Sequence, residues 1–146
     1  VYNENNILIK HFEGKRRGYL DLNDIGNIPC SFHPFINRNN QKKFEEIRSQ
    51  DVYNTACILN EHNTKISTIN GGYYKLNLQR KSVTKEDGFS HKINLAYIKY
   101  QIKSIKNKNL KIARMFAIRR INNIKYINWK KNNDKSFYEY LNEKEN

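Results

Sequence analysis

The side chains most suited to chemistry in this chain are the basic residues of its C-terminal half. Residues 99–131 contain eleven of them and no Asp or Glu. A helix face exposed only to solvent usually mixes both signs, because opposite charges one turn apart attract each other. A segment with only positive charges cannot form those pairs, so we interpret it as a surface that follows a phosphate backbone. The alternative is a basic helix face exposed to solvent. The eleven residues are Lys99, Lys103, Lys106, Lys108, Lys111, Arg114, Arg119, Arg120, Lys125, Lys130 and Lys131.

Two features of this segment bear on how it would contact a nucleic acid. Lys99, Lys103 and Lys106 are spaced by four and three residues, so they fall on one side of a helix. A row of this kind provides affinity for phosphates but does not read sequence. Aromatic rings interleave with the basic residues, and they could either stack on unpaired bases or pack in the protein core. These rings are Tyr97, Tyr100, Tyr126 and Trp129.

The charge of the whole chain favours the same class of partner. Lys and Arg number 27 against 14 Asp and Glu in 146 residues, a formal net charge of +13. This excess repels itself unless a polyanion screens it, which suggests nucleic acid or an anionic membrane surface. No apolar run approaches the ~20 residues that a spanning helix needs. We therefore expect nucleic acid as the partner, and no membrane.

Neither a metal site nor a catalytic site is expected. Cys30 and Cys57 form no C-x-x-C pair and the four histidines are scattered, so no zinc site is predicted. We expect two reduced thiols and no cofactor. A metal-dependent nuclease would need clustered carboxylates or a histidine pair. Asp21, Asp24 and His33 are the only candidates, and ordinary loop positions explain them better.

Long helices are predicted to position the basic residues, because residues 89–146 contain no Gly or Pro. Ser90 is the expected N-cap of the first helix, so that Ser90→Ala would cost ~1 kcal/mol of stability. The Asn-Lys-Asn of residues 107–109 is interpreted as a tight turn to a second helix. The first helix is expected to turn one apolar stripe inward, made of Ala96, Tyr97, Ile98, Ile102 and Ile105.

The second helix is predicted to carry an apolar stripe of its own and to lead into a short last helix. Asp134 could cap that last helix, which would bury Phe137, Tyr140 and Leu141. The expected fold class is mainly α: an antiparallel helical hairpin plus a short C-terminal helix, packed through the three stripes. The second stripe consists of Met115, Ile118, Ile121, Ile124 and Ile127.

The N-terminal half has a different character, with frequent Gly and Pro that mark turns and irregular structure. One helix is predicted over residues 41–59, with Phe44, Ile47, Val52, Ala56 and Leu59 on its apolar face. Residues 6–12 and 73–78 are β-prone. We divide the chain into an N-terminal extension, residues 1–85, and a helical module, residues 86–146. The extension is either a small subdomain or an arm ordered by its partner.

The order of these segments carries a resemblance to a known family. The string DGFSHKIN at residues 87–94 runs into an apolar helix, where the family has D-T-G-S-P-E-x-Q. A basic hairpin follows, then KYINWKK at residues 125–131 and FYEYL at residues 137–141. In order, spacing and charge, residues 87–146 resemble the universal small-subunit ribosomal protein fifteen, of bacterial and organellar type.

The resemblance implies particular RNA-contacting residues. At the RNA junction it implies Gly88, Ser90 and Asn94, while Gln101 stands where the family has an arginine. Gly88-Phe89 replaces the family's Thr-Gly, Asn94 replaces its glutamine, and the hairpin loop is shorter, without the family's His/Asp/Ser cluster. On the second helix the implied phosphate partners are Arg119, Arg120 and Lys125, and Trp129 is placed against the RNA backbone. Together with the basic residues of the hairpin, the expected RNA-binding set comprises Gly88, Ser90, Asn94, Gln101, Lys99, Lys103, Lys106, Lys108, Arg114, Arg119, Arg120, Lys125, Trp129, Lys130 and Lys131.

The resemblance also implies a function without catalysis. A member of this family binds a junction in the central domain of small-subunit rRNA and supports assembly of the platform. Its expected partners are that rRNA, neighbouring ribosomal proteins and a contact with the large subunit. The chain begins at Val1 rather than Met, and we expect that a leader has been removed or that residues precede it. The expected location is a mitochondrial ribosome, with a plastid-type organelle as second choice. A non-ribosomal helical RNA- or DNA-binding protein and, further off, a nuclease are the alternatives.

Overall fold

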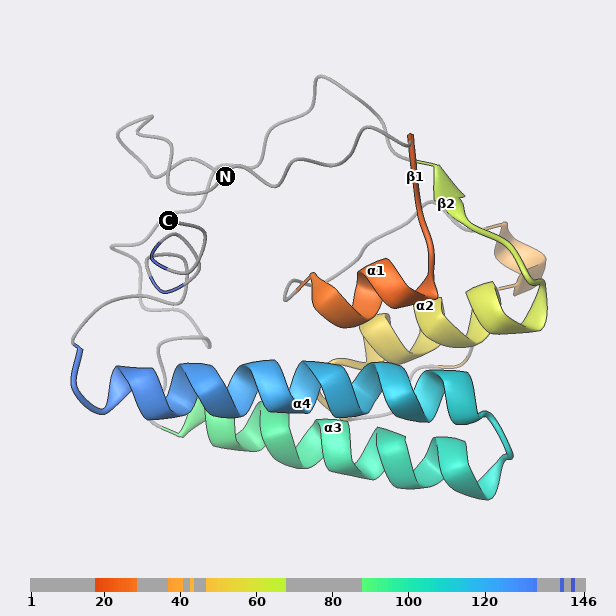
Figure 1. Ribbon diagram of the computed structural model, residues 1–146. Helices are drawn as coiled ribbons and strands as arrows, with labels where there is room; N and C mark the ends of the chain where they lie inside the picture. Colours follow the sequence, from red (N-terminus) through yellow and green to blue (C-terminus); the bar gives the residue numbers. More distant parts are fainter. Residues whose placement is uncertain are drawn as a thin grey trace.

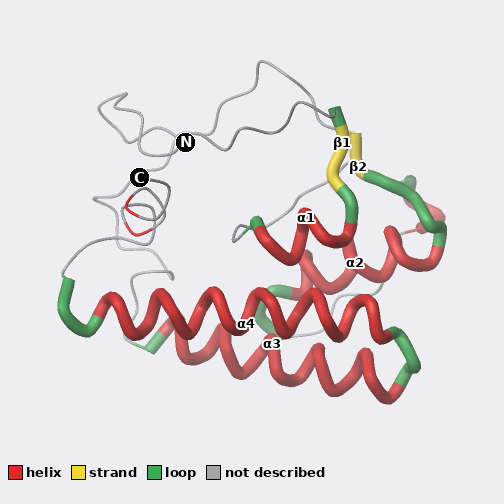
Figure 2. The backbone as a smooth tube through the Cα atoms, viewed as in Figure 1, coloured by secondary structure: helices red, strands yellow, loops and turns green. Residues whose placement is uncertain are grey.

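The computed structural model describes residues 18–28, 37–40, 43, 47–67, 88–133, 140 and 143, and within them the protein is mainly helical, as expected (Figures 1 and 2). In the N-terminal half there are two short strands, two α-helices and a 3-10 turn, and in the C-terminal half two long helices. The elements are β1 Tyr19–Leu20, α1 Leu22–Asn27, the 3-10 turn Arg38–Asn40, α2 Gln50–Glu61, β2 Ile66–Ser67, α3 Phe89–Lys106 and α4 Leu110–Lys130.

The predicted helical hairpin is confirmed. Figure 1 shows α3 and α4 side by side and running in opposite directions. The turn between them occupies residues 107–109, where Lys108 adopts a left-handed conformation with φ of 59°. The backbone N–H groups of Asn107 and Asn109 donate to carbonyls of the last turn of α3, at Lys103 and Ser104. These hydrogen bonds satisfy carbonyls that a helix end otherwise leaves without partners.

The predicted start of the first long helix is wrong by two residues. Helix α3 begins at Phe89, so Gly88 and not Ser90 is the N-cap, and no side chain caps the helix. Gly88 has a φ of 72°, a left-handed conformation that suits a residue without a Cβ. Ser90 lies inside the first turn, where its carbonyl oxygen accepts a hydrogen bond from the Asn123 Nδ2 of α4. The residue therefore joins the two helices through its backbone.

The buried sides of the two helices also differ from the predicted stripes. Ala96 and Tyr97 of the first stripe are buried, but Ile102 is 49% exposed and Ile105 is 51% exposed. Met115 of the second stripe is buried, whereas Ile121 and Ile124 are exposed. The residues buried in their place are Tyr100, Ser104, Ile112, Ala113, Phe116, Arg119 and Tyr126.

Aromatic packing explains this rotation of the helices. The Tyr100 ring stacks on Tyr53 of α2 at 4.4 Å between centroids, and the Phe116 ring lies 5.3 Å from Tyr100. Large rings bury more apolar area than an isoleucine, so the side of the hairpin that carries them is the one that packs inward. The Ser104 hydroxyl, fully buried beside them, donates to the Tyr100 carbonyl at 2.7 Å.

Helices α1 and α2 share this core. Ile25 of α1 and Val52, Ala56 and Leu59 of α2 belong to the same cluster of buried residues as the hairpin side chains. The expected boundary near residue 85 therefore does not separate two cores, and residues 18–28 and 47–67 are not an extended arm. Helix α1 approaches α4 closely at Gly26, where an added Cβ would come within 3.3 Å of the Met115 Cγ.

The other N-terminal predictions are met only in part. Helix α2 begins at Gln50, later than expected, although Val52, Ala56 and Leu59 are buried as predicted and Ile47 is packed against the core. Strands β1 and β2 form an antiparallel pair that the sequence did not indicate. Several predictions lie outside the described residues: the strands at residues 6–12 and 73–78, the burial of Phe44, and the Asp134 cap with Phe137 and Leu141. Tyr140 is described and is buried as predicted.

The start of α3 gives a direct test of the fold. Gly88→Ala should lower the free energy of unfolding by about 1–2 kcal/mol, because it places a Cβ in a left-handed conformation. Ser90→Ala should change it by less than about 0.5 kcal/mol, because the hydroxyl caps nothing. Urea unfolding followed by circular dichroism would measure both. A larger loss for Ser90→Ala than for Gly88→Ala would contradict this helix start.

Candidate nucleic-acid interface

Most of the basic side chains of the hairpin are exposed. Residues 88–133 contain no Asp or Glu, so nothing on this unit of two helices offsets their charge. The last turns of α3 and α4 carry lysines, where the negative ends of the helix dipoles favour them. The exposed basic residues of this region are Lys92, Lys99, Lys106, Lys108, Lys111, Arg114, Lys125, Lys130 and Lys131.

These residues form two rows, one on each helix. Lys92, Lys99 and Lys106 recur every seven residues and therefore lie on one side of α3. Lys103 lies beside that row and is half-exposed, with its Nζ 5.1 Å from the centre of the Tyr53 ring of α2. The α3 row, defined as Lys92, Lys99, Lys103 and Lys106, thus runs along the edge of the hairpin that borders α2.

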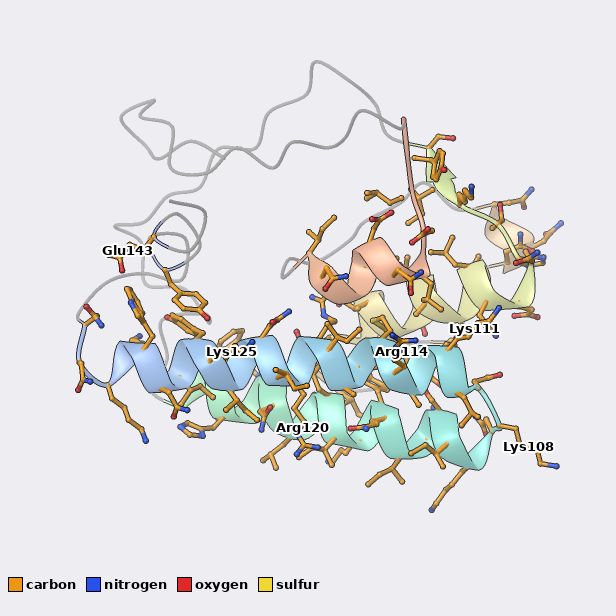
Figure 3. All side chains as sticks on the ribbon, viewed as in Figure 1. Lys108, Lys111, Arg114, Arg120, Lys125 and Glu143 are labelled. Carbon is orange, nitrogen blue, oxygen red and sulfur yellow. The ribbon has the colours of Figure 1, made fainter. Side chains whose placement is uncertain are left out.

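The second row runs along α4 (Figure 3). Lys111, Arg114 and Lys125 are exposed and share one side of the helix by their spacing of three and eleven residues. We call these three residues the α4 row. Lys108 lies in the turn, and Lys130 and Lys131 lie at the far end of α4. Cationic side chains are therefore presented along the length of the hairpin.

Arg119 does not belong to this surface, which corrects its expected role as a phosphate partner. It is only 4% exposed. Its Nη1 donates to the carbonyl oxygens of Ile25 at 2.7 Å and Ile28 at 2.9 Å, and its Nε donates to the Tyr97 hydroxyl at 3.3 Å. Since these bonds occupy the guanidinium inside the fold, Arg119 is not available to RNA.

The Arg119 contacts connect three helices. Ile25 and Ile28 stand at the C-terminal end of α1, where helix carbonyls lack partners within the helix. A guanidinium stays protonated even when buried, so it supplies positive charge at the negative end of α1. Its Cζ also lies 5.5 Å from the centre of the Tyr97 ring on α3. Arg119 of α4 therefore holds α1 and α3 in place.

The neighbouring arginine points elsewhere. Arg120 is half-exposed and lies between α4 and α3 in Figure 3, with its Nη1 3.5 Å from the Gln101 Oε1 of α3. This long contact leaves most of its five N–H donors open to a ligand. Gln101 and Arg120, expected separately as RNA contacts, therefore lie next to each other where the two helices meet.

Asn94 and Gly88 occupy different environments at the other end of the hairpin. The Asn94 Oδ1 is enclosed and has no hydrogen-bond partner in the described part of the chain. An enclosed oxygen cannot accept from an RNA hydroxyl without movement of the helices. Gly88 is exposed at the start of α3, so its backbone is accessible.

Trp129 lies in an aromatic cluster near the end of α4. Its ring centre is 6.2 Å from that of Tyr126 and 5.2 Å from that of Tyr140, and its Nε1 donates to a carboxylate oxygen of Glu143 at 3.1 Å. The ring is half-buried, and its one donor is engaged within the protein. Burial raises the pKa of the Tyr126 phenol in the same cluster.

The carboxylates considered for a nuclease have structural roles. Asp21 is the N-cap of α1, and its Oδ1 accepts from the N–H groups of Asn23 and Asp24. The Asp24 Oδ2 accepts from the Asp21 N–H in return, which completes a capping box. His33 lies outside the described residues. Among the residues that the structure describes, no three His, Cys, Asp or Glu gather as metal ligands.

One polar pocket was not indicated by the sequence. It has a volume of about 460 Å³ and lies between the second half of α2 and the turn of the hairpin. Its walls bring together residues about fifty positions apart in the chain, which is why no local pattern signalled it. They include four amide side chains, Asn54, Asn60, Asn107 and Asn109, and the lysines Lys43 and Lys103.

Comparisons with protein-family models, with curated proteins and with solved structures found no match to this chain. No helix within the described ranges combines the length and the apolar character that crossing a membrane requires.

The two adjacent arginines allow a matched test of the corrected assignment. Arg119→Met should lower the free energy of unfolding by about 3 kcal/mol, because it leaves buried carbonyls without donors. Arg120→Met should change it by less than about 1 kcal/mol, because that side chain is partly in solvent. Urea denaturation of both variants would measure the two losses in the free energy of unfolding. Equal stability, with RNA binding lost in Arg119→Met alone, would restore Arg119 to the interface.

The raised pKa of Tyr126 predicts part of the alkaline loss of stability. Burial favours the neutral phenol, so its contribution is complete below the ordinary value of 10.0 and is lost as the pH rises through the higher folded-state value. Between pH 9 and pH 11 the wild type should therefore lose more stability than Tyr126→Phe. Urea midpoints at the two pH values measure this difference, and equal losses would argue against it.

Proposed function

We propose that this protein binds folded RNA through the basic helical hairpin. The observation that carries the proposal is the acid-free surface of α3 and α4, on which nine basic residues are exposed along two rows and the helix ends. Binding of phosphates releases condensed counterions, so a surface of this kind gains affinity for RNA without base recognition.

The spacing of the rows suits a folded RNA better than a single straight duplex. The α3 row and the α4 row lie on the two different helices of the hairpin. Two RNA arms that meet at a junction could each contact one row. Because phosphates at a junction repel one another, a protein that neutralises two arms binds the closed junction more tightly than the open one. By binding the closed junction more tightly, the protein would promote folding of the RNA during assembly and would not need to catalyse a reaction.

The finer part of the proposal is a place in the small ribosomal subunit. It is supported by the resemblance of residues 87–146 to the small-subunit ribosomal protein fifteen and by a hairpin in the position that this resemblance implies. The partners would be a junction in the central domain of the small-subunit rRNA and neighbouring ribosomal proteins, with a large-subunit contact, in a mitochondrial or plastid-type organelle. In this proposal Arg114 and Lys111 bind the phosphates that the resemblance assigns to Arg119.

The second candidate is a non-ribosomal RNA- or DNA-binding protein that uses the same surface. Co-sedimentation in high salt separates the two. The ribosomal proposal expects the chain to remain with small subunits under conditions that retain their other proteins. Release of the chain while those proteins stay bound would favour the second candidate.

Charge reversal on the α4 row tests RNA binding itself. Arg114→Glu with Lys125→Glu should weaken binding to a three-way-junction RNA by at least about tenfold and reduce the slope of log K against log salt by about 2. Both residues are exposed, so the fold should be unchanged by circular dichroism. Filter binding across a range of salt concentrations would measure both quantities.

The matched control is Lys65→Glu with Thr64→Glu and Ser67→Glu. These three exposed residues lie at β2, outside the hairpin, and one reversal with two added carboxylates changes the net charge by the same amount. The control should retain most of the affinity. If both variants lost binding equally, the interaction would depend on net charge alone and the hairpin assignment would be wrong.

A further inference from the structure

The hairpin has an apolar face that nothing in the described structure covers. Six large aliphatic side chains on α3 and α4 are more than a third exposed. Their exposed fractions are 60% for Leu95, 49% for Ile102, 51% for Ile105, 69% for Leu110, 52% for Ile121 and 36% for Ile124. A contiguous apolar surface rimmed by charged residues marks an interaction site more often than an accident of composition.

Helical spacing places these side chains on one surface. Leu95, Ile98, Ile102 and Ile105 recur at intervals of three and four residues on α3, away from the buried Tyr97 and Tyr100. On α4, Leu110, Ala117, Ile121 and Ile124 follow one another at intervals of seven, four and three residues and so also share one side of the helix. The two stripes flank the seam where Arg120 meets Gln101. We call these eight residues with Arg120 the outer hairpin face.

The chemistry of this face limits what can cover it. A second copy would bring two acid-free surfaces together, and their like charges oppose that contact. A lipid bilayer would take up the isoleucines only if the Arg120 guanidinium between the two stripes extended back to the headgroup phosphates or entered the hydrocarbon at a cost in free energy. RNA offers phosphates to the basic rows but little aliphatic surface for the isoleucines. A protein can provide both an apolar surface and a carboxylate.

We propose that the outer hairpin face docks an amphipathic helix of another protein, with its apolar stripe on the isoleucines and an Asp or Glu against Arg120. Two antiparallel helices form a shallow seam into which the ridge of a third helix can pack. A carboxylate there would form a charge-assisted bidentate pair with the guanidinium as the interface excludes water. The partner therefore carries an apolar stripe with an acidic residue inside it.

This docking leaves cationic side chains on both edges of the hairpin open to RNA. Lys103 of the α3 row borders Tyr53 of α2. In the α4 row, Arg114 follows Leu110 by four residues and precedes Ile121 by seven, so it lies at the edge of the apolar stripe, whereas Lys111 lies farther round the helix. A protein partner and an RNA can thus be engaged together, as in a ribonucleoprotein. The inference does not depend on RNA binding, because the face and Arg120 are present in the free chain.

A selection with the full chain tests the proposal. A phage library of helical peptides with randomised surface positions would be selected against wild type, and the leading peptide measured by fluorescence anisotropy. Peptides with an apolar stripe and an Asp or Glu within it should be enriched. Ile102→Asn with Ile121→Asn should weaken the leading peptide at least tenfold, whereas Lys65→Glu with Thr64→Glu and Ser67→Glu should not.

Arg120→Gln makes the test specific for the ion pair. It should weaken binding about fivefold, and replacing the acidic residue of the peptide by its amide should then cause no further loss. Enrichment without an acidic residue, or equal binding to Ile102→Asn with Ile121→Asn, would overturn the proposal. Two further results would overturn the proposal. They are pelleting of the free chain with phosphatidylserine vesicles and formation of a dimer in sedimentation equilibrium, in either case if Ile102→Asn with Ile121→Asn abolished the association.

Discussion

The buried guanidinium of Arg119 is the contact on which the arrangement of this protein depends. It joins the carbonyl end of α1 to α4 and to the Tyr97 hydroxyl of α3, so one side chain fixes three helices. Around it the rings of Tyr53, Tyr100 and Phe116 form the centre of the core. A buried charge is stable only when its donors are satisfied, so α1 must sit where its last carbonyls meet α4. Together with the stacking of these rings, this constraint sets which side of the hairpin faces inward.

The orientation of the hairpin in turn determines what its surface presents. With the aromatic side turned inward, the lysines of the α3 row and the α4 row lie along the two edges, and the isoleucines lie between them on the outer hairpin face. A protein that worked alone would gain stability by burying those isoleucines. Their exposure, with cationic edges on both sides, is what we would expect if a partner helix docks there as proposed. We therefore regard RNA binding and helix docking as two uses of one scaffold.

The sequence predicted the hairpin because its signals are local. The lack of Gly and Pro after Gly88 and the Asn-Lys-Asn turn fix two helices without reference to other elements. It did not predict which side is buried, because Ile102 and Ile121 fit a helical stripe as well as Tyr100 and Phe116 do. That choice depends on α1 and α2, which pack on the hairpin from distant parts of the chain. Arg119 was misassigned for the same reason: sequence shows a basic residue but not the carbonyls of α1 that surround it.

We propose that the edges of the hairpin contact folded RNA, and lysine footprinting can show which side chains do so. The full chain would be acetylated briefly with and without a three-way-junction RNA, and each modified lysine quantified by mass spectrometry. We expect RNA to protect Lys99, Lys106, Lys111 and Lys125 but not Lys65, which lies beside β2. Protection of Lys65 equal to that of the hairpin lysines would contradict it, because RNA would then be held by charge alone.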